Sequence, residues 1–541
     1  MTKPFAITLE MGTSLANRTG NWRVERPIYV DRLPPCNQAC PAGENIQGWL
    51  YRAEEGDYEG AWRILVEDNP LPAIMGRVCY RPCETACNRR QLDDPVGVNA
   101  VERFIGDEAL RRGWRFTPAA QETGKRVLVV GSGPCGLSAA YHLRKLGHAV
   151  TLVDSEAATG GMMRAGIPSY RLPRDVLSGE IDRIVELGIE VQLGTRITNM
   201  ESAYLDGGFD AALVAVGAQL SHRAEVPAGD SARILQALSV LRSVEAGEPV
   251  SLGRRVAVYG GGNTAFDAAR TARRLGAADA VVVYRRTRDR MPAHDIEVEE
   301  AEAEGIQVRW LSTVKRADAG ALVLEKMRLD DHGFPQPTGE FEELAADSLL
   351  LALGQDSDLS LLDAVPGVTL HEGTVGVDGD LMTGRPGIFA GGDAVDGERS
   401  VTTAVGHGKR AARHIDSWLR GDAPTPQAKH ELATFERLNT WYYSDAERTV
   451  RPELETVRRQ TTFDEVVKGL DETNALFEAR RCLSCGNCLE CDNCYGVCPD
   501  NAVMKLGPQK RYAIDYEYCK GCGICVTECP CGAITMVPES T

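Results

Sequence analysis

The sequence predicts an α/β protein with two doubly wound, Rossmann-like nucleotide-binding domains, the second inserted in the first. Short Val/Ile/Leu strands alternate with amphipathic helices from Lys125 onward. Glycine-rich turns follow two of these strands, at residues 131–136 and 260–265. A Gly-Gly-Asp segment at 391–393 then returns to the pattern of the first domain. The outer domain is therefore expected to be discontinuous.

Length and charge limit what the chain can be. Its 541 residues are too many for one hydrophobic core, so several domains are expected. The formal net charge of −17 argues against a nucleic-acid partner, because phosphate binding needs a basic surface. The chain has no 18-residue apolar run, and its first 20 residues lack the basic start and apolar stretch of a secretory signal. We expect a cytoplasmic protein with no membrane partner.

The first glycine-rich turn has the features of a dinucleotide site. Gly131, Gly133 and Gly136 form a Gly-x-Gly-x-x-Gly motif between a strand and a helix, and Asp154 ends the next strand. Such glycines let the backbone approach a pyrophosphate at a helix N-terminus, and the acid can accept from a ribose hydroxyl. Cys135, inside this turn, is expected to be only a small packing residue.

The second glycine-rich turn repeats the motif as Gly260, Gly262 and Ala265. The strand after its helix ends in Arg285 and Arg286, where an NAD site usually carries an acid. Arginines at this position can pair with a 2′-phosphate, which favours NADP(H), with NAD(H) as the other possibility. A solvated basic strand end that binds no phosphate is the structural alternative.

A third segment favours FAD in the outer domain. Gly391, Gly392 and Asp393 follow an apolar strand, so the carboxylate of Asp393 could reach the ribityl chain of a flavin. His407, farther along, could hydrogen-bond there, although a structural role is the commoner fate of a single histidine. With the two glycine-rich turns, the segment predicts one FAD and one nicotinamide nucleotide.

The 17 cysteines gather at residues 36–87 and 482–531, with only Cys135 between. A reducing compartment favours metal ligation over disulfides. Residues 482–541 contain Cys-x2-Cys-x2-Cys-x3-Cys-Pro twice, the spacing of ferredoxins with two [4Fe-4S] clusters, in which each fourth cysteine ligates the other cluster; zinc is the disfavoured alternative. The expected ligands are Cys488, Cys491, Cys494 and Cys529 for one cluster, and Cys519, Cys522, Cys525 and Cys498 for the other.

The N-terminal cysteines follow no simple ferredoxin or zinc spacing, so the spacing leaves both a cluster and zinc open. They are Cys36, Cys40, Cys79, Cys83 and Cys87.

The order of these motifs resembles a known family over about residues 26–420. N-terminal cysteines, the first glycine-rich turn, GGGNTAFDAAR, YRR, MPA (291–293) and PGIFAGGDAV (386–395) occur as in the small subunit of glutamate synthase, the electron-input half of dihydropyrimidine dehydrogenase and the large subunit of NADH-dependent ferredoxin:NADP oxidoreductases. The extension at 482–541 resembles that of iron-sulfur flavoproteins that serve sulfite reductases or 2-oxoacid oxidoreductases. The resemblance adds Gly161, Asn263, Thr403 and Ala404 to the cofactor-binding set, the last two through backbone contacts with the flavin.

One departure from the family suggests an unusual cluster. The relatives carry an RCxxCG motif ahead of the cysteine that matches Cys36, but this chain has Ile28 and Asp31 at the matching positions. The same local sequence, RCLSCG, occurs instead at 481–486. We therefore predict one cluster on Cys36, Cys87, Cys482 and Cys485, and another on Cys40, Cys79 and Cys83 with Glu102, where the relatives use Gln or Glu; only Cys135 and Cys531 are left over.

The sequence thus predicts an FAD-dependent NAD(P)H:acceptor (ferredoxin-type) oxidoreductase with four [4Fe-4S] clusters. The expected partner is a redox protein: a 2-oxoacid:ferredoxin oxidoreductase, a sulfite reductase, the large subunit of glutamate synthase or a ferredoxin. An oligomer is compatible with the sequence. The expected domains are 1–120 (helical iron-sulfur), 121–249 and 346–420 (FAD), 250–345 (NADPH), 421–481 (linker and helical segment) and 482–541 (ferredoxin-like).

Two other functions are weighed against this one. The first is the small subunit of a working glutamate synthase, which would need a separate large subunit because Thr2, not a cysteine, follows Met1. The second, from another class, is a zinc-stabilised scaffold that binds other proteins. It is disfavoured, and a brown colour that bleaches when NADPH is added would exclude it.

Overall fold

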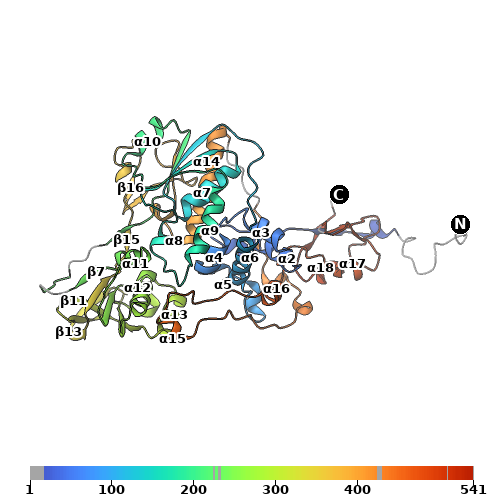
Figure 1. Ribbon diagram of the computed structural model, residues 1–541. Coiled ribbons are helices and arrows are strands. Elements are labelled where there is room, and N and C mark those ends of the chain that lie inside the picture. Colours follow the sequence, from blue (N-terminus) through green and yellow to red (C-terminus); the bar gives the residue numbers. More distant parts are fainter. Residues whose placement is uncertain (1–17, 223–225, 230–232, 423–428, 509, 540–541) are drawn as a thin grey trace, which may run out of the picture.

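The computed structural model describes residues 18–222, 226–229, 233–422, 429–508 and 510–539. Figure 1 shows two α/β units stacked at one side, a helical unit against them, and a cysteine-rich unit that projects from the helical unit at the other side. Among the described residues, none of the helices is both long and apolar enough to cross a membrane.

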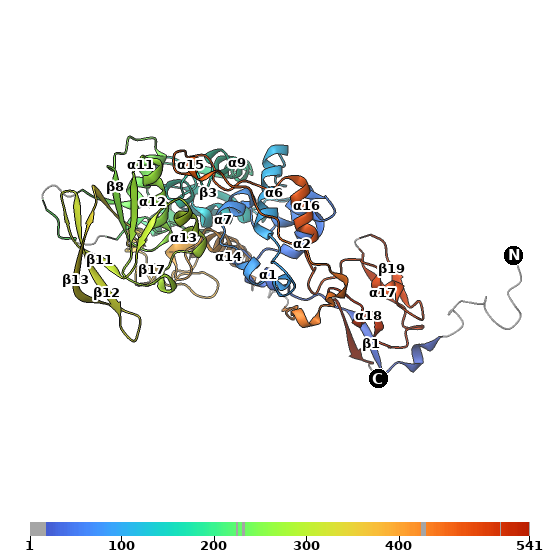
Figure 2. The same cartoon turned by 90° about the horizontal axis from the view of Figure 1, so that it is seen from below.

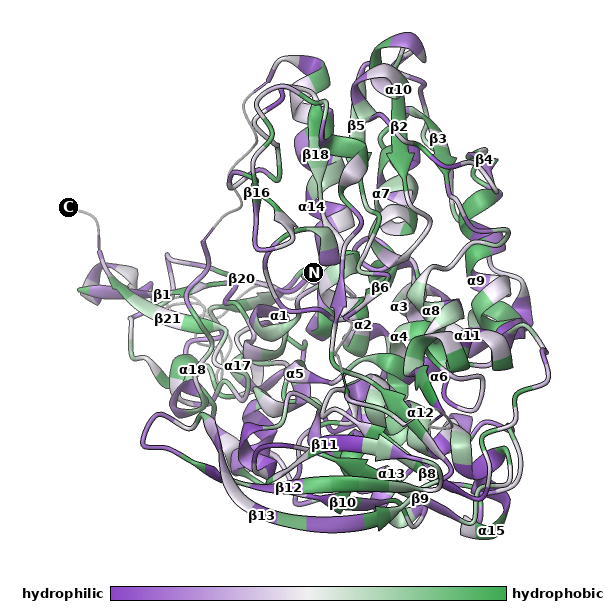
Figure 3. Cartoon of the chain, turned by 90° about the vertical axis from the view of Figure 1, so that its left-hand side faces the viewer, coloured by the Kyte–Doolittle hydropathy of each residue, from purple (hydrophilic) through white to green (hydrophobic). Residues whose placement is uncertain are grey.

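The first α/β unit is built on a parallel sheet with the strand order β18-β5-β2-β3-β4. Its central strands are continuous apolar runs, because both faces of a parallel sheet are normally covered. Figure 3 shows these strands in the green of apolar residues. The strands of the sheet are β2 (Arg126–Val130), β3 (Ala149–Val153), β5 (Ala211–Val214), β18 (Ile388–Ala390) and the more polar edge strand β4 (Glu190–Gln192).

Two helices from distant parts of the chain pack together beside this sheet, α7 (Pro134–Lys145) and α14 (Val401–Arg420). Ser400 caps α14 by accepting the backbone N–H of Thr403 at 3.1 Å. The unit begins at β2 and ends at α14, and the second α/β unit lies between β5 and β18 in the sequence. The first unit is therefore discontinuous, as the sequence predicted. Its other helices are α8 (Met162–Ala165), α9 (Arg174–Val185) and α10 (Met200–Asp206).

The second α/β unit has the parallel strand order β10-β9-β8-β14-β7. Two of these strands lie outside the predicted limits 250–345, which were too narrow because no glycine-rich turn marks either strand. The elements are β7 (Ile234–Gln236), β8 (Arg255–Tyr259), β9 (Asp279–Val283), β10 (Gln307–Arg309), β14 (Ser348–Leu351), α11 (Ala237–Glu245), α12 (Asn263–Arg274) and α13 (Asp295–Ala303).

A three-stranded antiparallel sheet covers one face of the second unit. Its buried side chains, including Val314 and Leu324, pack against Ala257 and Leu349 of the parallel sheet. Two shorter ladders complete the α/β region. The strands are β11 (Ser312–Asp318), β12 (Ala321–Leu329) and β13 (Pro335–Ala345), with the pairs β6 (Leu220–Ser221) and β15 (Gln355–Asp356), and β16 (Leu370–His371) and β17 (Thr374–Val375).

The N-terminal unit is helical, as expected, and its helices α4 and α6 cross in direct backbone contact. A Cβ on Gly76 would lie 2.3 Å from the Cβ of Arg103, and one on Gly106 would lie 2.3 Å from the backbone nitrogen of Ala73. Only glycine permits so close a crossing. The helices are α1 (Pro35–Ala39), α2 (Ile46–Ala53), α3 (Tyr58–Leu65), α4 (Pro72–Val78), α5 (Pro82–Thr85) and α6 (Val98–Arg112).

The segment before the ferredoxin-like unit is less helical than the sequence predicted. Residues 429–471 run mostly without regular structure, and a full helix forms only at α16 (Glu472–Arg480). High charge misled the prediction, since many polar groups of this stretch hydrogen-bond with neighbouring units. Of the predicted linker at 421–430, residues 423–428 lie outside the described residues. Short elements are η6 (Phe435–Arg437), η7 (Thr440–Tyr442) and α15 (Thr456–Arg459).

The C-terminal unit receives a strand from the other end of the chain. Strand β1 (Glu25–Tyr29) pairs antiparallel with β21 (Ile534–Pro538), from Glu25 opposite Pro538 to Tyr29 opposite Ile534. Figure 2 shows this pair beside α17 and α18. The strand therefore packs outside the predicted helical domain of residues 1–120. The remaining elements are α17 (Asn493–Gly496), α18 (Ile524–Thr527), β19 (Val503–Lys505) and β20 (Tyr512–Ile514).

Candidate functional site

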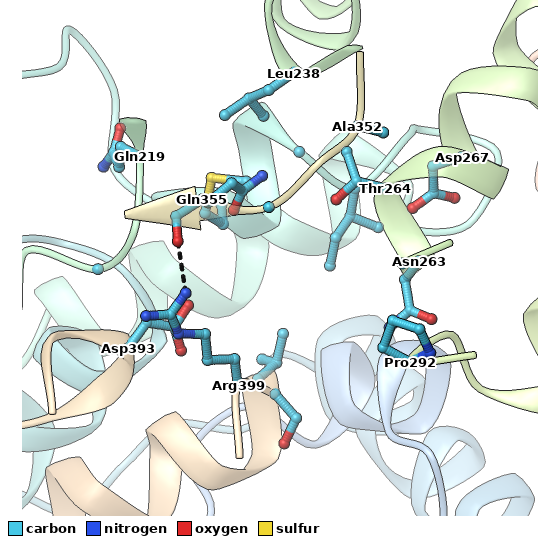
Figure 4. Close-up of a pocket in the computed structure, with 18 of the residues that line it drawn as sticks. Gln219, Leu238, Asn263, Thr264, Asp267, Pro292, Ala352, Gln355, Asp393 and Arg399 are labelled. Carbon is cyan, nitrogen blue, oxygen red and sulfur yellow. Dashed lines mark hydrogen bonds between the residues drawn. The ribbon is translucent and has the colours of Figure 1, made fainter. Parts of the chain in front are cut away.

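A cavity of about 1160 Å³ lies between the two α/β units. Both glycine-rich turns line it, through Gly131 and Gly133 on one side and Gly260 and Gly262 on the other. In Figure 4, Asp393 and its neighbours face the start of α12 across this space. The cavity lies at the carboxyl ends of the parallel strands, which is where open α/β sheets bind ligands. It has the size and lining for two nucleotides that meet.

The first glycine-rich turn is shaped to receive a pyrophosphate. Gly131 has a φ of 106°, and a Cβ there would lie 2.3 Å from the carbonyl oxygen of Ala215. A Cβ on Gly136 would lie 1.8 Å from the oxygen of Gly131, so this glycine lets α7 pack closely against the turn. Nothing lies within 4 Å of a Cβ on Gly133, which faces open space. The three positions therefore fit the roles of the motif.

Asp154 and Gly161 hold this turn in place. The carboxylate of Asp154 accepts hydrogen bonds from the backbone N–H and hydroxyl of Ser132, at 2.6 and 2.5 Å, and from the backbone N–H of Glu156 at 2.9 Å. Gly161 has a φ of 51°, and a Cβ there would lie 2.8 Å from the Cα of Gly133. Both residues also line the cavity. The role predicted for Asp154 at a ribose stays a prediction.

The second glycine-rich turn repeats this geometry. Gly260 has a φ of 151°, and its Cβ would lie 2.1 Å from the carbonyl oxygen of Ala352. Gly262 again faces open space. Ala265 is fully buried and packs α12 against the sheet, so it does not line the cavity. The turn and the N-terminus of α12 therefore form a second anion-binding corner.

The arginines after β9 face the same cavity. Arg285 and Arg286 both line it, and neither has an ion pair with a carboxylate in the part of the chain that the structure describes. The Nε of Arg286 is buried without a hydrogen-bond partner. A buried donor normally finds an acceptor, so this orphan fits a phosphate ligand better than a merely solvated strand end.

The flavin-type segment forms the opposite wall. Gly392 and Asp393 line the cavity, and burial raises the pKa of the Asp393 carboxyl. The backbone N–H of Gly392 donates to Nδ1 of His407 at 3.2 Å, so His407 supports this loop. Burial lowers the pKa of His407, which keeps Nδ1 available as an acceptor.

The start of α14 contributes one of the two predicted residues to the cavity. Ala404 lines it. Thr403 does not line the cavity: its hydroxyl lies 2.9 Å from that of Ser400, within the helix cap. Arg399, which the sequence analysis missed, donates to the carbonyl oxygen of Gln355 at 2.6 Å across the crossover between the two units (Figure 4). No local motif marks that arginine.

Asn263 joins the second turn to the helical unit. Its side-chain amide donates to the hydroxyl of Tyr80 at 2.9 Å, and its oxygen accepts the backbone N–H of His294 at 3.0 Å. The rings of Tyr80 and His294 stack with centroids 3.5 Å apart. Tyr80 was also missed, although its position beside Cys79 was a signal. The nicotinamide side of the cavity therefore touches the residue next to a predicted cluster ligand.

All 17 cysteines lie in the described part of the chain and have free thiols. All but Cys135 and Cys531 fall into four groups, within which thiols act on one another electrostatically. The chain-end group is Cys36, Cys87, Cys482 and Cys485. Burial raises the pKa of Cys36, and the nearby charges of the other three thiols raise it further. The structure thus brings these thiols from both ends of the chain together, while their role as ligands stays a prediction.

Arg481 fastens the chain-end group to the helical unit. Its guanidinium, fully buried, donates to Glu478 at 2.5 Å, to the carbonyl oxygen of Asp94 at 2.7 Å and to Asp93 at 3.2 Å. The carbonyl oxygen of Arg481 accepts from Arg89 at 2.7 Å. A buried charge needs such partners. They position Cys482, the next residue.

The inner group is Cys40, Cys79, Cys83 and Glu102. Burial raises the pKa of Glu102 far above its usual value, and the charges of Glu44 and Cys79 raise it further. Its side chain is therefore not a solvated surface carboxylate, and it faces the thiols. Glu44, a second buried carboxylate that the sequence analysis missed, shares Asn69 with it: the Asn69 amide donates to Glu44 at 2.9 Å and to Glu102 at 3.0 Å.

The ferredoxin-like unit holds two further groups. Cys488, Cys491 and Cys494 each lie close enough to Cys529 for its charge to raise their pKa values, after the larger effect of burial. A small cavity is lined by the other four thiols. Backbone N–H groups donate to sulfur at Cys498 and Cys529, at 3.2 and 3.3 Å, as in cluster sites. The second group is Cys498, Cys519, Cys522 and Cys525.

The groups follow one another from the cavity to the ferredoxin-like unit. Thr402, between the cavity residues Val401 and Ala404, lies close to the thiol of Cys79 in the inner group, and its hydroxyl donates to the sulfur of Met75 at 3.6 Å. The charge of Cys36 in the chain-end group raises the pKa of Cys83 in the inner group. Within the ferredoxin-like unit, Cys525 feels the charge of Cys494. Four sets of sulfur-rich donors in a row have the chemistry of [4Fe-4S] sites.

Three protein-family models match the chain. Residues 125–408 match the pyridine nucleotide-disulphide oxidoreductase family. Residues 25–114 match the family described as dihydropyrimidine dehydrogenase domain II, 4Fe-4S cluster, and residues 487–533 match a 4Fe-4S dicluster domain. The first match spans more than half of the chain, and all three agree with the order of units in the structure.

Three curated proteins are similar to this chain over most of its length. The NADP(+)-dependent formate dehydrogenase subunit beta of Moorella thermoacetica is 37% identical over 503 residues, covering 83% of this chain and 70% of that protein. The NADPH-Fe(3+) oxidoreductase subunit beta of Geobacter sulfurreducens is 32% identical, with 85% and 77% covered. The glutamate synthase [NADPH] small chain of Escherichia coli is 32% identical, with 71% and 89% covered. This chain therefore belongs to the pyridine nucleotide-disulphide oxidoreductase family, as an iron-sulfur flavoprotein of the glutamate synthase small chain type that binds FAD, NADP(H) and [4Fe-4S] clusters.

Proposed function

We propose that this chain is the NADPH-dependent electron-transfer subunit of a larger redox complex. It moves electrons between NADPH and a one-electron partner through FAD and four [4Fe-4S] clusters. The observation that carries the proposal is the row of sites from one shared nucleotide cavity to a projecting ferredoxin-like unit.

The residues of the cavity bind and orient the two nucleotides. The turns at 131–136 and 260–265 hold the pyrophosphates, and Arg285 and Arg286 hold the 2′-phosphate of NADPH. His407 supports the loop of Gly392 and Asp393 beside the flavin. When bound, FAD accepts a hydride and gives up single electrons, so it connects NADPH with the clusters. No acid-base pair is required for this transfer.

The cysteine groups supply the ligands for four clusters. The chain-end group holds one, the inner group with Glu102 a second, and the ferredoxin-like unit the last two. Thiols that gather in fours, or in threes with a buried carboxylate, support this assignment. Zinc would serve for one such group, but four groups in a row beside a flavin site favour electron transfer.

The partner is proposed to be a separate catalytic protein that docks on the ferredoxin-like unit. Cys491 and Cys522, one from each group of this unit, are exposed, so electrons can leave there. The similar proteins are named as subunits of a formate dehydrogenase, an NADPH-Fe(3+) oxidoreductase and a glutamate synthase. A 2-oxoacid:ferredoxin oxidoreductase or a sulfite reductase would make the same use of this unit.

An anaerobic titration of the purified chain with NADPH tests the core of the proposal. The flavin and cluster absorbance should bleach together, and EPR should show reduced [4Fe-4S] clusters, with a much weaker effect of NADH. Dithionite serves as the control that the clusters can be reduced. If dithionite reduces them and NADPH reduces neither flavin nor clusters, the proposal is wrong.

Purification of the tagged chain from its native cells tests the partner. We expect a stoichiometric redox protein, whose complex is then assayed with NADP(H) for formate oxidation, sulfite reduction, 2-oxoacid turnover and glutamate formation. Glutamate formed with an added large subunit would favour the glutamate synthase alternative, which the similarity to the Escherichia coli small chain supports. A chain that stays alone and turns over a metabolite with NADPH contradicts the subunit role.

A further inference from the structure

Tyr443 lies where the irregular segment before α16 meets the ferredoxin-like unit. It follows the 3₁₀ helix η7 and is half-buried, whereas its neighbours Trp441 and Tyr442 are exposed. Its hydroxyl donates to the carbonyl oxygen of Leu483 at 3.0 Å, inside the loop between Cys482 and Cys485. The nucleotide and cluster motifs leave this residue without a role.

The phenol of Tyr443 faces thiols of two different groups. Burial raises its pKa, and the charges of Cys531, Cys482, Cys485 and Cys491 raise it further. Cys482 and Cys485 belong to the chain-end group, while Cys491 belongs to the first group of the ferredoxin-like unit. The ring therefore lies near thiols of both groups, and its hydrogen bond to Leu483 fixes it against the chain-end loop.

A hydrogen bond joins the same two groups through the backbone. The N–H of Gly486, next to Cys485, donates to the carbonyl oxygen of Cys531 at 2.6 Å. The sulfur of Cys531 lies 3.7 Å from that of Cys529. This hydrogen bond thus joins Gly486, which follows Cys485 of the chain-end group, to Cys531, which lies beside Cys529 of the ferredoxin-like unit.

The surroundings hold this junction rigidly. Gly486 has a φ of 75°, and a Cβ there would lie 2.4 Å from the Cβ of Arg32, so only glycine fits. Arg32 donates to the carbonyl oxygen of Gly532 at 2.6 Å. Asn439 donates its backbone N–H to Pro530 at 3.1 Å and its side-chain amide to Thr527 at 2.8 Å. The irregular segment therefore contacts the ferredoxin-like unit through Asn439 and the chain-end loop through Tyr443.

We propose that Tyr443 and the Gly486–Cys531 hydrogen bond form the electron-transfer junction between the cluster of the chain-end group and the first cluster of the ferredoxin-like unit. Tyr443 is a positioning residue: it fills the space between the clusters, excludes water and fixes the Cys482–Cys485 loop through Leu483. This inference rests on the proposed function.

Each transfer at this junction moves one electron. The donor cluster is oxidised by one electron and the acceptor cluster is reduced by one, with no bond formed and no proton moved. NADPH supplies the electrons as a hydride and leaves as NADP⁺. The rate depends steeply on the separation of the clusters and on the packing between them, so a change at Tyr443 should slow this step.

The test compares Tyr443→Leu, which removes the ring, with Tyr443→Phe, which keeps the ring and loses the hydroxyl. Trp441→Leu is the matched control, since Trp441 is 87% exposed on the same segment. Each variant is mixed rapidly with NADPH without oxygen, flavin reduction is followed by absorbance, and the ferredoxin-unit clusters are followed by EPR on rapidly frozen samples. Iron content and the midpoint potentials of the clusters are measured in parallel.

We expect Tyr443→Leu to keep its iron and its rate of flavin reduction but to slow reduction of the ferredoxin-unit clusters by about tenfold or more. Tyr443→Phe should recover most of that rate, and Trp441→Leu should match the wild type. A fully loaded Tyr443→Leu protein whose ferredoxin-unit clusters reduce at the wild-type rate overturns the inference. If NADPH fails to reduce the clusters of the wild type as well, the proposed function fails instead.

If Tyr443→Leu loses iron, the comparison moves to Tyr443→Phe, in which the ring and hence the packing are retained. The lost hydrogen bond frees the Leu483 carbonyl, so the EPR signal of the chain-end cluster should change and the transfer should slow measurably. A Tyr443→Phe protein with unchanged signal and rate, beside an iron-depleted Tyr443→Leu protein, would show a purely structural tyrosine and contradict the proposal.

Discussion

Arg481 is buried between α16 and the loop at 93–95, immediately before Cys482. Burial alone would raise the pKa of Asp93, but its hydrogen bonds with Arg89 and Ala446, and the charges of Arg89 and Arg481, lower it to about 2. Glu478, also fully buried, accepts from Arg481 and from the backbone of Gly97. One residue thus satisfies several buried groups that would otherwise be left unpaired.

Arg481→Ala should therefore destabilise the fold and the chain-end site together. Removing one partner of a buried ion pair costs about 3–5 kcal/mol, because the other charges stay buried. Chemical denaturation and iron analysis should show lower stability and loss of one cluster. Arg480→Ala is the matched control, since Arg480 is exposed and its only hydrogen bond in the described chain is to the carbonyl oxygen of Glu54. An Arg481→Ala protein as stable as this control would contradict the anchoring role.

Arg285 and Arg286, just after β9, are expected to set the preference for NADPH over NADH. Arg285→Ala with Arg286→Ala removes two of the cations that face the cavity, and charge-assisted hydrogen bonds contribute about 1.5–3 kcal/mol each. The preference for NADPH over NADH, measured as the ratio of kcat/KM values, should fall about a hundredfold or more.

Arg288→Ala controls for the loss of charge near this strand. Arg288 forms ion pairs with Glu299 and Glu302 of α13 and does not line the cavity. Its replacement should leave the nucleotide preference unchanged. A double variant at 285 and 286 that keeps the wild-type preference would mean that the basic strand end is only solvated.

At the scale of elements, α7 and α14 hold the FAD side of the cavity by close backbone contact. A Cβ on Gly408 of α14 would lie 2.3 Å from the carbonyl oxygen of Cys135 and 2.8 Å from the backbone nitrogen of Ala139, both on α7. Because α7 begins at the first glycine-rich turn, a shift of α14 moves the turn as well. Packing of the two helices and binding of FAD are therefore linked.

Gly408→Ala should separate these helices. Overpacking of this kind costs about 1–3 kcal/mol, and here it acts on backbone atoms that cannot rotate away. We expect less flavin per chain after purification and a lower melting temperature, measured by absorbance and by calorimetry. Arg413→Ala, at an exposed position of the same helix, should change neither. Full flavin content in Gly408→Ala would show that the contact is not needed.

The elements also show where local patterns fail. The glycine-rich turns predicted β2, α7, β8 and α12, because a phosphate-binding motif of this kind lies between a strand and a helix. Strands β7 and β14 carry no such requirement, so the predicted limits 250 and 345 missed them. The charged stretch before the ferredoxin-like unit was expected to be helical, but several of its charges pair with other units, as Glu465 does with Arg77 and Arg103.

On the scale of the whole molecule, both ends of the described chain meet in the C-terminal unit. Strand β1 pairs with β21, the backbone of Val30 donates to Ala533 at 2.9 Å, and Arg23 forms an ion pair with Glu539 at 2.5 Å. The chain-end group likewise combines Cys36 and Cys87 with Cys482 and Cys485 from the other end of the chain. Assembly of that group therefore depends on closure of the chain.

Cys482→Ser with Cys485→Ser tests this dependence. If the chain-end group holds a cluster, the variant should lose about four iron atoms per chain and one EPR signal, while the ferredoxin-like clusters remain. Cys135→Ser, which changes a cysteine outside all four groups, should keep its full iron content. A double variant that retains all of its iron would remove Cys482 and Cys485 from the ligand set.

The sequence by itself determined the two glycine-rich turns, the arginine pair and the doubled ferredoxin spacing. Each of these is a local pattern in which the chemistry of a phosphate or a cluster prescribes neighbouring residue types. Only the tertiary structure decided that Glu102 is buried beside Cys79, that Tyr80 contacts Asn263, and that Tyr443 contacts the loop between Cys482 and Cys485. These contacts join segments far apart in the chain, and which distant segments meet depends on packing of the whole core, which no local spacing encodes.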